Sequence, residues 1–247
     1  MRRISRFALP QAALVKLSSN TEEIRRLPPG KQRADRAVAL WKRLPIGTKR
    51  SIQGVLAAMS TGLQRCMYCE DGQGTDIEHF RPKSAYPLHA FVWGNYLLAC
   101  SHCNSNHKRT AFPLDADGTP LLIDPTVDDP VEHMALSPST GLFEARDAKG
   151  TATIAVCGLN RDVCASGRQD AWVSLSQLAI RYAMLRDRDP ASSHAEEILR
   201  AVRRYPFQSV RVHMVEILKS PRAARLLVQP ETRQAFERYP ELAGLSA

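Results

Sequence analysis

The sequence lacks the features that would place it in a membrane or in a fibrous or disordered class. None of its apolar runs approaches the roughly 18 residues of a membrane-spanning helix, and it contains no internal repeat and no low-complexity segment. Aromatic residues make up only 6% of the chain, whereas the 44% hydrophobic content is ordinary for a folded domain. With 247 residues the chain is long enough for one large domain or two small ones, so we expect a soluble protein with a substantial core and no membrane partner.

Acidic side chains are missing from the first 20 residues, and residues 1–65 hold 14 Lys and Arg against 3 Asp and Glu. The net charge of +9 therefore comes from the N-terminal part of the chain. Such basicity favours binding to a phosphate backbone, although a solvated helix surface is the alternative. A basic, acid-free start is also typical of an organellar transit peptide, and Pro10 interrupts the apolar stretch that a secretory signal would need. We expect a cytoplasmic protein.

Cysteines are few, and four of the six stand in two close Cys-x-x-Cys pairs. The pairs are Cys66 with Cys69 and Cys100 with Cys103. Two pairs at this spacing predict a zinc ion held by four thiolates, because each pair supplies two ligands from a single turn. The remaining Cys157 and Cys164 have no obvious bridging pattern, which suits a reducing compartment.

The segment between and just after these pairs carries residues that phosphodiester hydrolysis requires. His79 has an ordinary pKa near neutrality and can act as the base that deprotonates water. Glu78 beside it is a hard oxygen donor suited to Mg²⁺ or Mn²⁺. A histidine next to a glutamate is common on protein surfaces, and only its place between the cysteine pairs favours the functional interpretation. For Asn95 and Asn104, a cap or a turn is the alternative to a role in the site.

The stretches CMYC, DIEHFRPKS and WGNYLLACSHCNSNHK together resemble an HNH endonuclease of the ββα-metal class in its four-cysteine form. The resemblance implies that His79 is the general base and that Asn95 orients it. It also implies that Glu78 and Asn104 bind a catalytic Mg²⁺ or Mn²⁺ ion, while the zinc ion is structural.

Further residues in the same stretches are candidates for metal or nucleic-acid binding. Asp76 is an alternative carboxylate ligand, and His107 is a further candidate for the catalytic ion. The positive charges of Arg81, Lys83 and Lys108 are predicted to bind the phosphates of a nucleic acid, with solvation as the alternative.

The wider pattern is similar to that of HNH nucleases encoded beside an ATPase in bacterial anti-phage loci, the Septu and retron-associated type. It rests on EHFRPKS followed by YP, the tryptophan before NYLLAC, IDP at 123–125 and GLNR at 158–161. This resemblance implies a nuclease that a partner ATPase controls. We expect DNA as the nucleic acid, with RNA or tRNA as the open alternatives. Two other functions stay open: a stand-alone HNH restriction-type endonuclease, and a zinc-stapled DNA-binding or adaptor protein without catalysis.

The fold expected from these patterns is α+β and mostly α. We expect three parts: basic helices over 1–65, the zinc-stapled HNH core of the resemblance over 66–125, and a small β element followed by helices over 126–247. Turn signals predict strands within 114–156, and the alternation of residues over 151–156 predicts that this stretch is one of them. The helical tail is a candidate docking surface for the partner.

Overall fold

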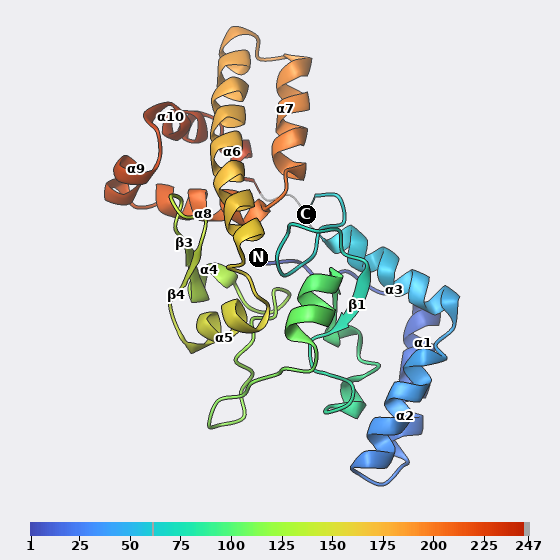
Figure 1. The fold of residues 1–247 in the computed structure, drawn as a ribbon. Coiled ribbons are helices and arrows are strands. Elements are labelled where there is room, and N and C mark those ends of the chain that lie inside the picture. Colours follow the sequence, from blue (N-terminus) through green and yellow to red (C-terminus); the bar gives the residue numbers. More distant parts are fainter. Residues whose placement is uncertain (61, 245–247) are drawn as a thin grey trace.

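The computed structural model describes residues 1–60 and 62–244, which are mostly helical with two small antiparallel sheets (Figure 1). The first helices are α1 (Gln11–Arg25), α2 (Lys31–Lys42) and α3 (Ile46–Met59). They confirm the short N-terminal helices, with Gly30 and Pro45 directly before α2 and α3. The extended segment ahead of α1 buries Met1, Ile4 and Leu9 in the main core.

The first sheet consists of β1 (Asp76–His79) and β2 (Tyr96–Ala99), which pair in antiparallel fashion. Glu78 lies opposite Leu97 and His79 opposite Tyr96, and every residue of β2 is buried. The connection contains two single-turn helices, η1 (Pro87–His89) and η2 (Trp93–Asn95), and a helix of π type, η3 (His102–Lys108), comes soon after β2. Helix α3 packs against both strands. This order places Glu78 and His79 on a strand whose partner leads straight into the second cysteine pair.

The second sheet is a short hairpin flanked by helices. Its elements are α4 (Pro130–His133), β3 (Met134–Leu136), β4 (Phe143–Ala145) and α5 (Ala148–Val156). The hairpin confirms the small antiparallel β element. Its turn contains Gly141 at φ +66°, where an added Cβ would lie 2.0 Å from the carbonyl oxygen of Ala165, so a glycine is required there.

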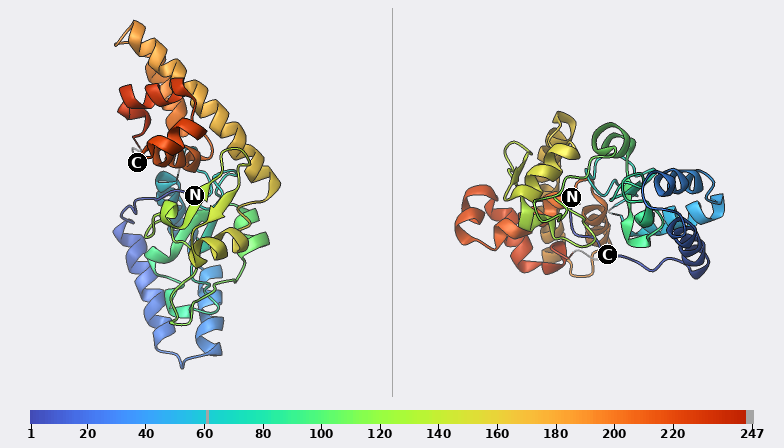
Figure 2. Two further views of the ribbon diagram at one scale, coloured as in Figure 1. Left: turned by 90° about the vertical axis from the view of Figure 1, so that its left-hand side faces the viewer. Right: turned by 90° about the horizontal axis from the view of Figure 1, so that it is seen from below.

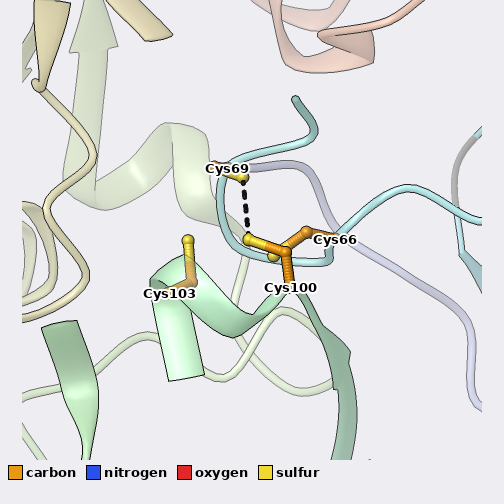
Figure 3. A group of neighbouring side chains, drawn as sticks. All are labelled: Cys66, Cys69, Cys100 and Cys103. Carbon is orange, nitrogen blue, oxygen red and sulfur yellow. Dashed lines mark hydrogen bonds between the residues drawn. The ribbon is translucent and has the colours of Figure 1, made fainter. Parts of the chain in front are cut away.

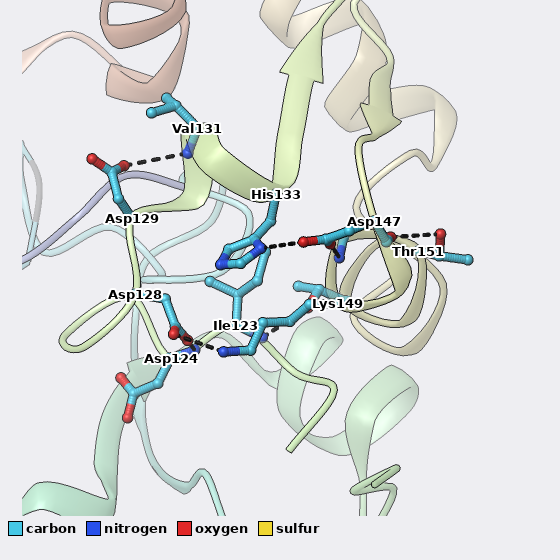
Figure 4. Close-up of polar contacts among 11 residues, drawn as sticks. Ile123, Asp124, Asp128, Asp129, Val131, His133, Asp147, Lys149 and Thr151 are labelled. Carbon is cyan, nitrogen blue, oxygen red and sulfur yellow. Dashed lines mark hydrogen bonds and ion pairs between the residues drawn. The ribbon is translucent and has the colours of Figure 1, made fainter. Parts of the chain in front are cut away.

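Residues 151–156 belong to helix α5, so the strand predicted for them is wrong. The carboxylate of Asp147 caps this helix by accepting a hydrogen bond of 2.8 Å from the N–H of Gly150 (Figure 4). The hydroxyl of the buried Thr153 accepts a hydrogen bond of 2.8 Å from the N–H of Ile123. The hydroxyl of Thr151 donates a hydrogen bond of 2.9 Å to the backbone oxygen of Asp147, so the two threonines contact different parts of the chain from one helix rather than marking a face of a strand.

The C-terminal part is helical, as predicted. It contains α6 (Asp162–Arg188), α7 (Ser193–Arg204), α8 (Gln208–Leu218), α9 (Pro221–Leu227), α10 (Pro230–Arg238) and the single turn η4 (Pro240–Leu242). Helix α6 packs against α7, α8 and α10. Figures 1 and 2 show α6 and α7 side by side at one end of the molecule and α1 with α2 at the other. No helix built from the described residues combines the length and the apolar character that crossing a membrane requires.

Candidate functional site

The four paired cysteines meet at one point, with their sulfur atoms all within 4.8 Å of one another (Figure 3). All four side chains are buried. The sulfur atoms of Cys69 and Cys100 are 3.8 Å apart, which is close to the edge of a tetrahedron of thiolates about 2.3 Å from a central zinc ion. The donor set and its size thus fit one metal ion such as zinc. Such an ion would join the loop before β1 to the end of β2 and the start of η3.

Contacts within the cluster favour thiolates on part of it. The thiol of Cys100 lowers the pKa of Cys69, and the thiol of Cys103 lowers the pKa of Cys100 to about 7. The guanidinium group of Arg161 lies 3.7 Å from the sulfur of Cys103 and adds a positive charge beside it. A bound cation would favour the thiolate form of all four ligands.

His79, at the end of β1, is a buried imidazole beside two aromatic rings. The ring centroids of Trp41 and Tyr96 lie 4.4 and 5.2 Å from that of His79, both in edge-to-face geometry. Nε2 of His79 is 3.1 Å from the carbonyl oxygen of Ala90. Because a carbonyl oxygen can only accept, Nε2 carries the proton and Nδ1 keeps a free lone pair. Burial, and then the charge of Lys83, lowers the pKa of His79 to about 3, so the ring is neutral at pH 7.

Asn95 holds the loop after β1 rather than the imidazole of His79 itself. Its Oδ1 accepts a hydrogen bond of 2.8 Å from the N–H of Arg81, and its Nδ2 donates to the carbonyl oxygens of Arg81 and His89, each at 3.0 Å. Asn95 was predicted to orient His79 directly, but the imidazole contacts the carbonyl oxygen of Ala90 instead. Since His89 precedes Ala90, Asn95 fixes the segment that orients the histidine.

Lys108, predicted to bind nucleic acid, is instead fully buried. Its Nζ lies 2.6 Å from Oε1 of Glu78 and donates a hydrogen bond of 3.2 Å to the backbone oxygen of His79. Burial raises the pKa of Glu78, and the charge of Lys108 opposes this rise. The ammonium group therefore acts inside the protein as the partner of the carboxylate.

Glu78, His79 and Asn104 line one small cavity of about 90 Å³, together with Lys83 and Arg109. The cavity thus brings together the predicted acid, base and distal asparagine with one of the predicted phosphate-binding lysines. Arg109 was not predicted. The only signal for it in the sequence is a basic residue directly after the motif, which is too common to be informative.

Asn104 contacts the alternative carboxylate ligand. Its Nδ2 donates a hydrogen bond of 3.0 Å to Oδ2 of Asp76. The oxygen Oδ1 of Asn104 takes no part in this hydrogen bond. The oxygen atoms of Glu78 and Asn104 are hard donors of the kind that Mg²⁺ and Mn²⁺ bind. Among the described residues, however, the four cysteines form the one group of three or more His, Cys, Asp or Glu side chains close enough to share an ion.

Two other predicted site residues lie outside this cavity. His107 is exposed, and its ring covers Gly158 so closely that an added Cβ would lie 2.5 Å from its Cε1 atom. The guanidinium group of Arg81 lies 5.5 and 5.2 Å from the ring centroids of Tyr86 and Phe112. Both side chains are therefore packed against neighbours rather than directed at the candidate acid and base.

The architecture is thus that of a mostly helical protein built around a cluster of four cysteines that could hold a metal ion. Over 142 residues, 45% of this chain and 47% of the relative, it is 32% identical to the Septu protein PtuB of Bacillus mycoides (strain KBAB4). Over 111 residues, 43% of this chain and 40% of the relative, it is 33% identical to the Septu protein PtuB of Bacillus thuringiensis. The matches span less than half the length of either relative, and no family model matches the chain. The similarity supports a Septu-type protein, as the motifs predicted.

Proposed function

We propose that the chain is a metal-dependent HNH endonuclease that hydrolyses phosphodiester bonds, with DNA as the substrate and His79 as the general base. The observation that carries this proposal is the cavity in which Glu78, His79 and Asn104 meet beside the four-cysteine site. The succession of β1, β2 and η3 agrees with the ββα core that the HNH resemblance implies.

The residues around the cavity have the chemistry for this reaction. His79 keeps Nδ1 free, and its neutral ring can accept a proton from an attacking water molecule. Lys83 and Arg109 can bind the oxygens of the scissile phosphate. A divalent ion, when bound by oxygens of Glu78 and Asn104, supplies positive charge to the phosphoryl and leaving oxygens. The four cysteines would hold a zinc ion that ties this framework together.

We further propose that this nuclease acts in anti-phage defence and that a partner ATPase controls it. The similarity to two Septu PtuB proteins supports the role in defence, and the helices beyond residue 160 offer a docking surface. Co-purification with the product of a neighbouring gene tests the partner. A protein that is fully active alone and binds no such product would instead be a stand-alone endonuclease.

One observation favours the alternative of a zinc-stapled DNA-binding or adaptor protein without catalysis. Glu78 is already paired with Lys108, so a divalent ion has to compete with the ammonium group for the carboxylate. Cleavage that depends on Mg²⁺ or Mn²⁺ separates the two functions.

The decisive experiment compares His79→Ala with His102→Ala in plasmid cleavage with Mg²⁺ or Mn²⁺, with and without the neighbouring gene product. Loss of a general base should slow cleavage by at least about 100-fold, whereas His102 is exposed on η3 and its loss should have no effect. Both variants should retain zinc, and thermal melts control for the packing that His79 loses. A folded His79→Ala protein that cuts at the original rate would refute the assignment.

A further inference from the structure

A second cavity, of about 420 Å³, lies where the N-terminal segment meets the ends of α3 and α7. It shares no lining residue with the cavity that contains His79. Four arginines line it, and of the described lining residues none carries a carboxylate. The four are Arg2, Arg3, Arg203 and Arg204. We call this the basic cavity.

None of the four arginines of the basic cavity forms an ion pair within 4.0 Å with a described residue. Glu70 is the carboxylate that acts on Arg2. Its Oε2 is 3.2 Å from the amino group of Met1 and accepts a hydrogen bond of 2.9 Å from the N–H of Ser209, while its buried Oε1 has no hydrogen-bond partner. The buried Nε of Arg2 has no hydrogen-bond partner. The cavity thus has donors and positive charge in excess of acceptors.

The positive charge of the basic cavity also affects the pKa of a buried neighbour, Arg211. Burial, followed by the charges of Arg2 and Arg203, lowers the pKa of Arg211 to about 10. Arg203 and Arg204 lie in the last turn of α7, where they suit the helix dipole. That explanation does not extend to Arg2 and Arg3, which come from a segment far away in the sequence and add charge to the same cavity.

The geometry of the basic cavity is fixed by close backbone packing. Gly62 has φ +59°, and an added Cβ there would lie 2.8 Å from the carbonyl oxygen of Arg204. The loop that carries Gly62 and the end of α7 therefore touch directly. This contact fixes the backbone at the end of α7, from which the exposed side chains of Arg203 and Arg204 extend.

We propose that the basic cavity binds a nucleoside polyphosphate. Planar guanidinium groups pair with phosphate oxygens in bidentate fashion, and several converging arginines suit a compact polyanion. The volume of about 420 Å³ lies within the range of small-molecule sites. Phe7, which also lines the cavity and is 37% exposed, offers an aromatic surface for a base. A concave pocket favours such a ligand over the extended backbone of a nucleic acid, and the proposal does not depend on nuclease activity.

The test is a titration of the purified chain with a fluorescent ATP analogue in the absence of added Mg²⁺. Unlabelled ATP and inorganic tripolyphosphate should compete for the site, whereas adenosine should not. The double variant Arg203→Gln/Arg204→Gln should bind about tenfold or more weakly, because it loses two charge-assisted contacts. Arg200→Gln, exposed on the same helix but outside the cavity, should bind as the original chain does.

Two further probes distinguish the sources of phosphate. Phe7→Ala should weaken the binding of ATP while leaving that of tripolyphosphate unchanged, which would support contact with the base. Affinity for ATP that is the same in the double variant, or absent altogether, would overturn the proposal. A single-stranded oligonucleotide that binds through Arg203 and Arg204 while ATP does not would overturn it in favour of a nucleic-acid track. Thermal melts show whether each variant is folded, and both substituted arginines have exposed side chains.

Discussion

Lys108 Nζ lies 2.6 Å from Glu78 Oε1, and both side chains are buried. The same ammonium group donates a hydrogen bond to the backbone oxygen of His79, so one lysine on η3 contacts both candidate catalytic positions on β1. Removing two charges from water is unfavourable, and a buried pair is stable only when both partners are present in good geometry. The pair therefore ties the end of η3 to the strand that carries the acid and the base.

Lys108→Met should lower the free energy of unfolding by about 3–5 kcal/mol at pH 7, because Glu78 would be left buried without its partner. Adding Glu78→Gln should recover part of this loss. Lys149→Met is the matched control, since its pair with Asp128 is partly exposed and should contribute about 1 kcal/mol or less. Urea unfolding of these variants and of the Glu78→Gln single variant gives the coupling energy between Lys108 and Glu78. If Lys108→Met and the double variant lose the same free energy of unfolding, the unpaired Glu78 is not the cause of the destabilisation.

The predictions that succeeded rest on constraints that act locally along the chain. Two Cys-x-x-Cys pairs limit the geometry of a metal site whatever surrounds them, and the cluster of four sulfurs agrees with that limit. The helices expected over residues 1–65 are present as α1, α2 and α3, and Gly30 and Pro45 stand directly before the second and third of them. In both cases a few neighbouring residues determine the outcome.

The predictions that failed depended on contacts between distant segments. Lys108 looks like any basic surface residue in the sequence, and only the packing of η3 on β1 buries it. The contact that orients His79 comes from the backbone carbonyl of Ala90. Every residue has such a carbonyl group, so the sequence does not indicate which one makes this contact. Residues 151–156 alternate as a strand does, but the cap provided by Asp147 starts a helix.

Cys66→Ser should abolish zinc binding and cooperative unfolding. A structural zinc site contributes about 10–16 kcal/mol of apparent binding free energy, and the surrounding loops have little regular structure of their own. Cys157→Ala is the control, because burial raises the pKa of that cysteine to about 12 and it lies outside the cluster as a free thiol. Metal analysis and circular dichroism melts measure both effects. A Cys66→Ser protein that melts cooperatively with no bound metal would exclude the four-thiolate site.

Asn95→Asp should destabilise the protein by about 2–3 kcal/mol, because a carboxylate cannot donate to the carbonyl oxygens of Arg81 and His89 and repels both. The loop that orients His79 should loosen, so cleavage should slow while the zinc content stays unchanged. Asn106→Asp, exposed on η3, is the matched control and should change stability by less than about 0.5 kcal/mol. Denaturant unfolding and plasmid cleavage measure the two effects. If cleavage slows equally in both variants, the loop contacts of Asn95 are not responsible.

His213 on α8 should make the protein less stable in acid. Its ring lies 5.6 Å from that of Phe143, and burial, followed by nearby positive charges, lowers its pKa to about 3. Between pH 6.5 and 3 the unfolded chain therefore binds a proton that the folded chain does not, so stability falls as the pH falls, by about 1.4 kcal/mol per pH unit for this group. His213→Met should remove this contribution and make the decline between pH 6.5 and 5 shallower in urea unfolding, whereas His194→Met, at an exposed position on α7, should leave it unchanged. Burial of His79 acts in the same direction, so part of the decline should remain in both variants. An unchanged decline in His213→Met would show that the acid sensitivity has another source.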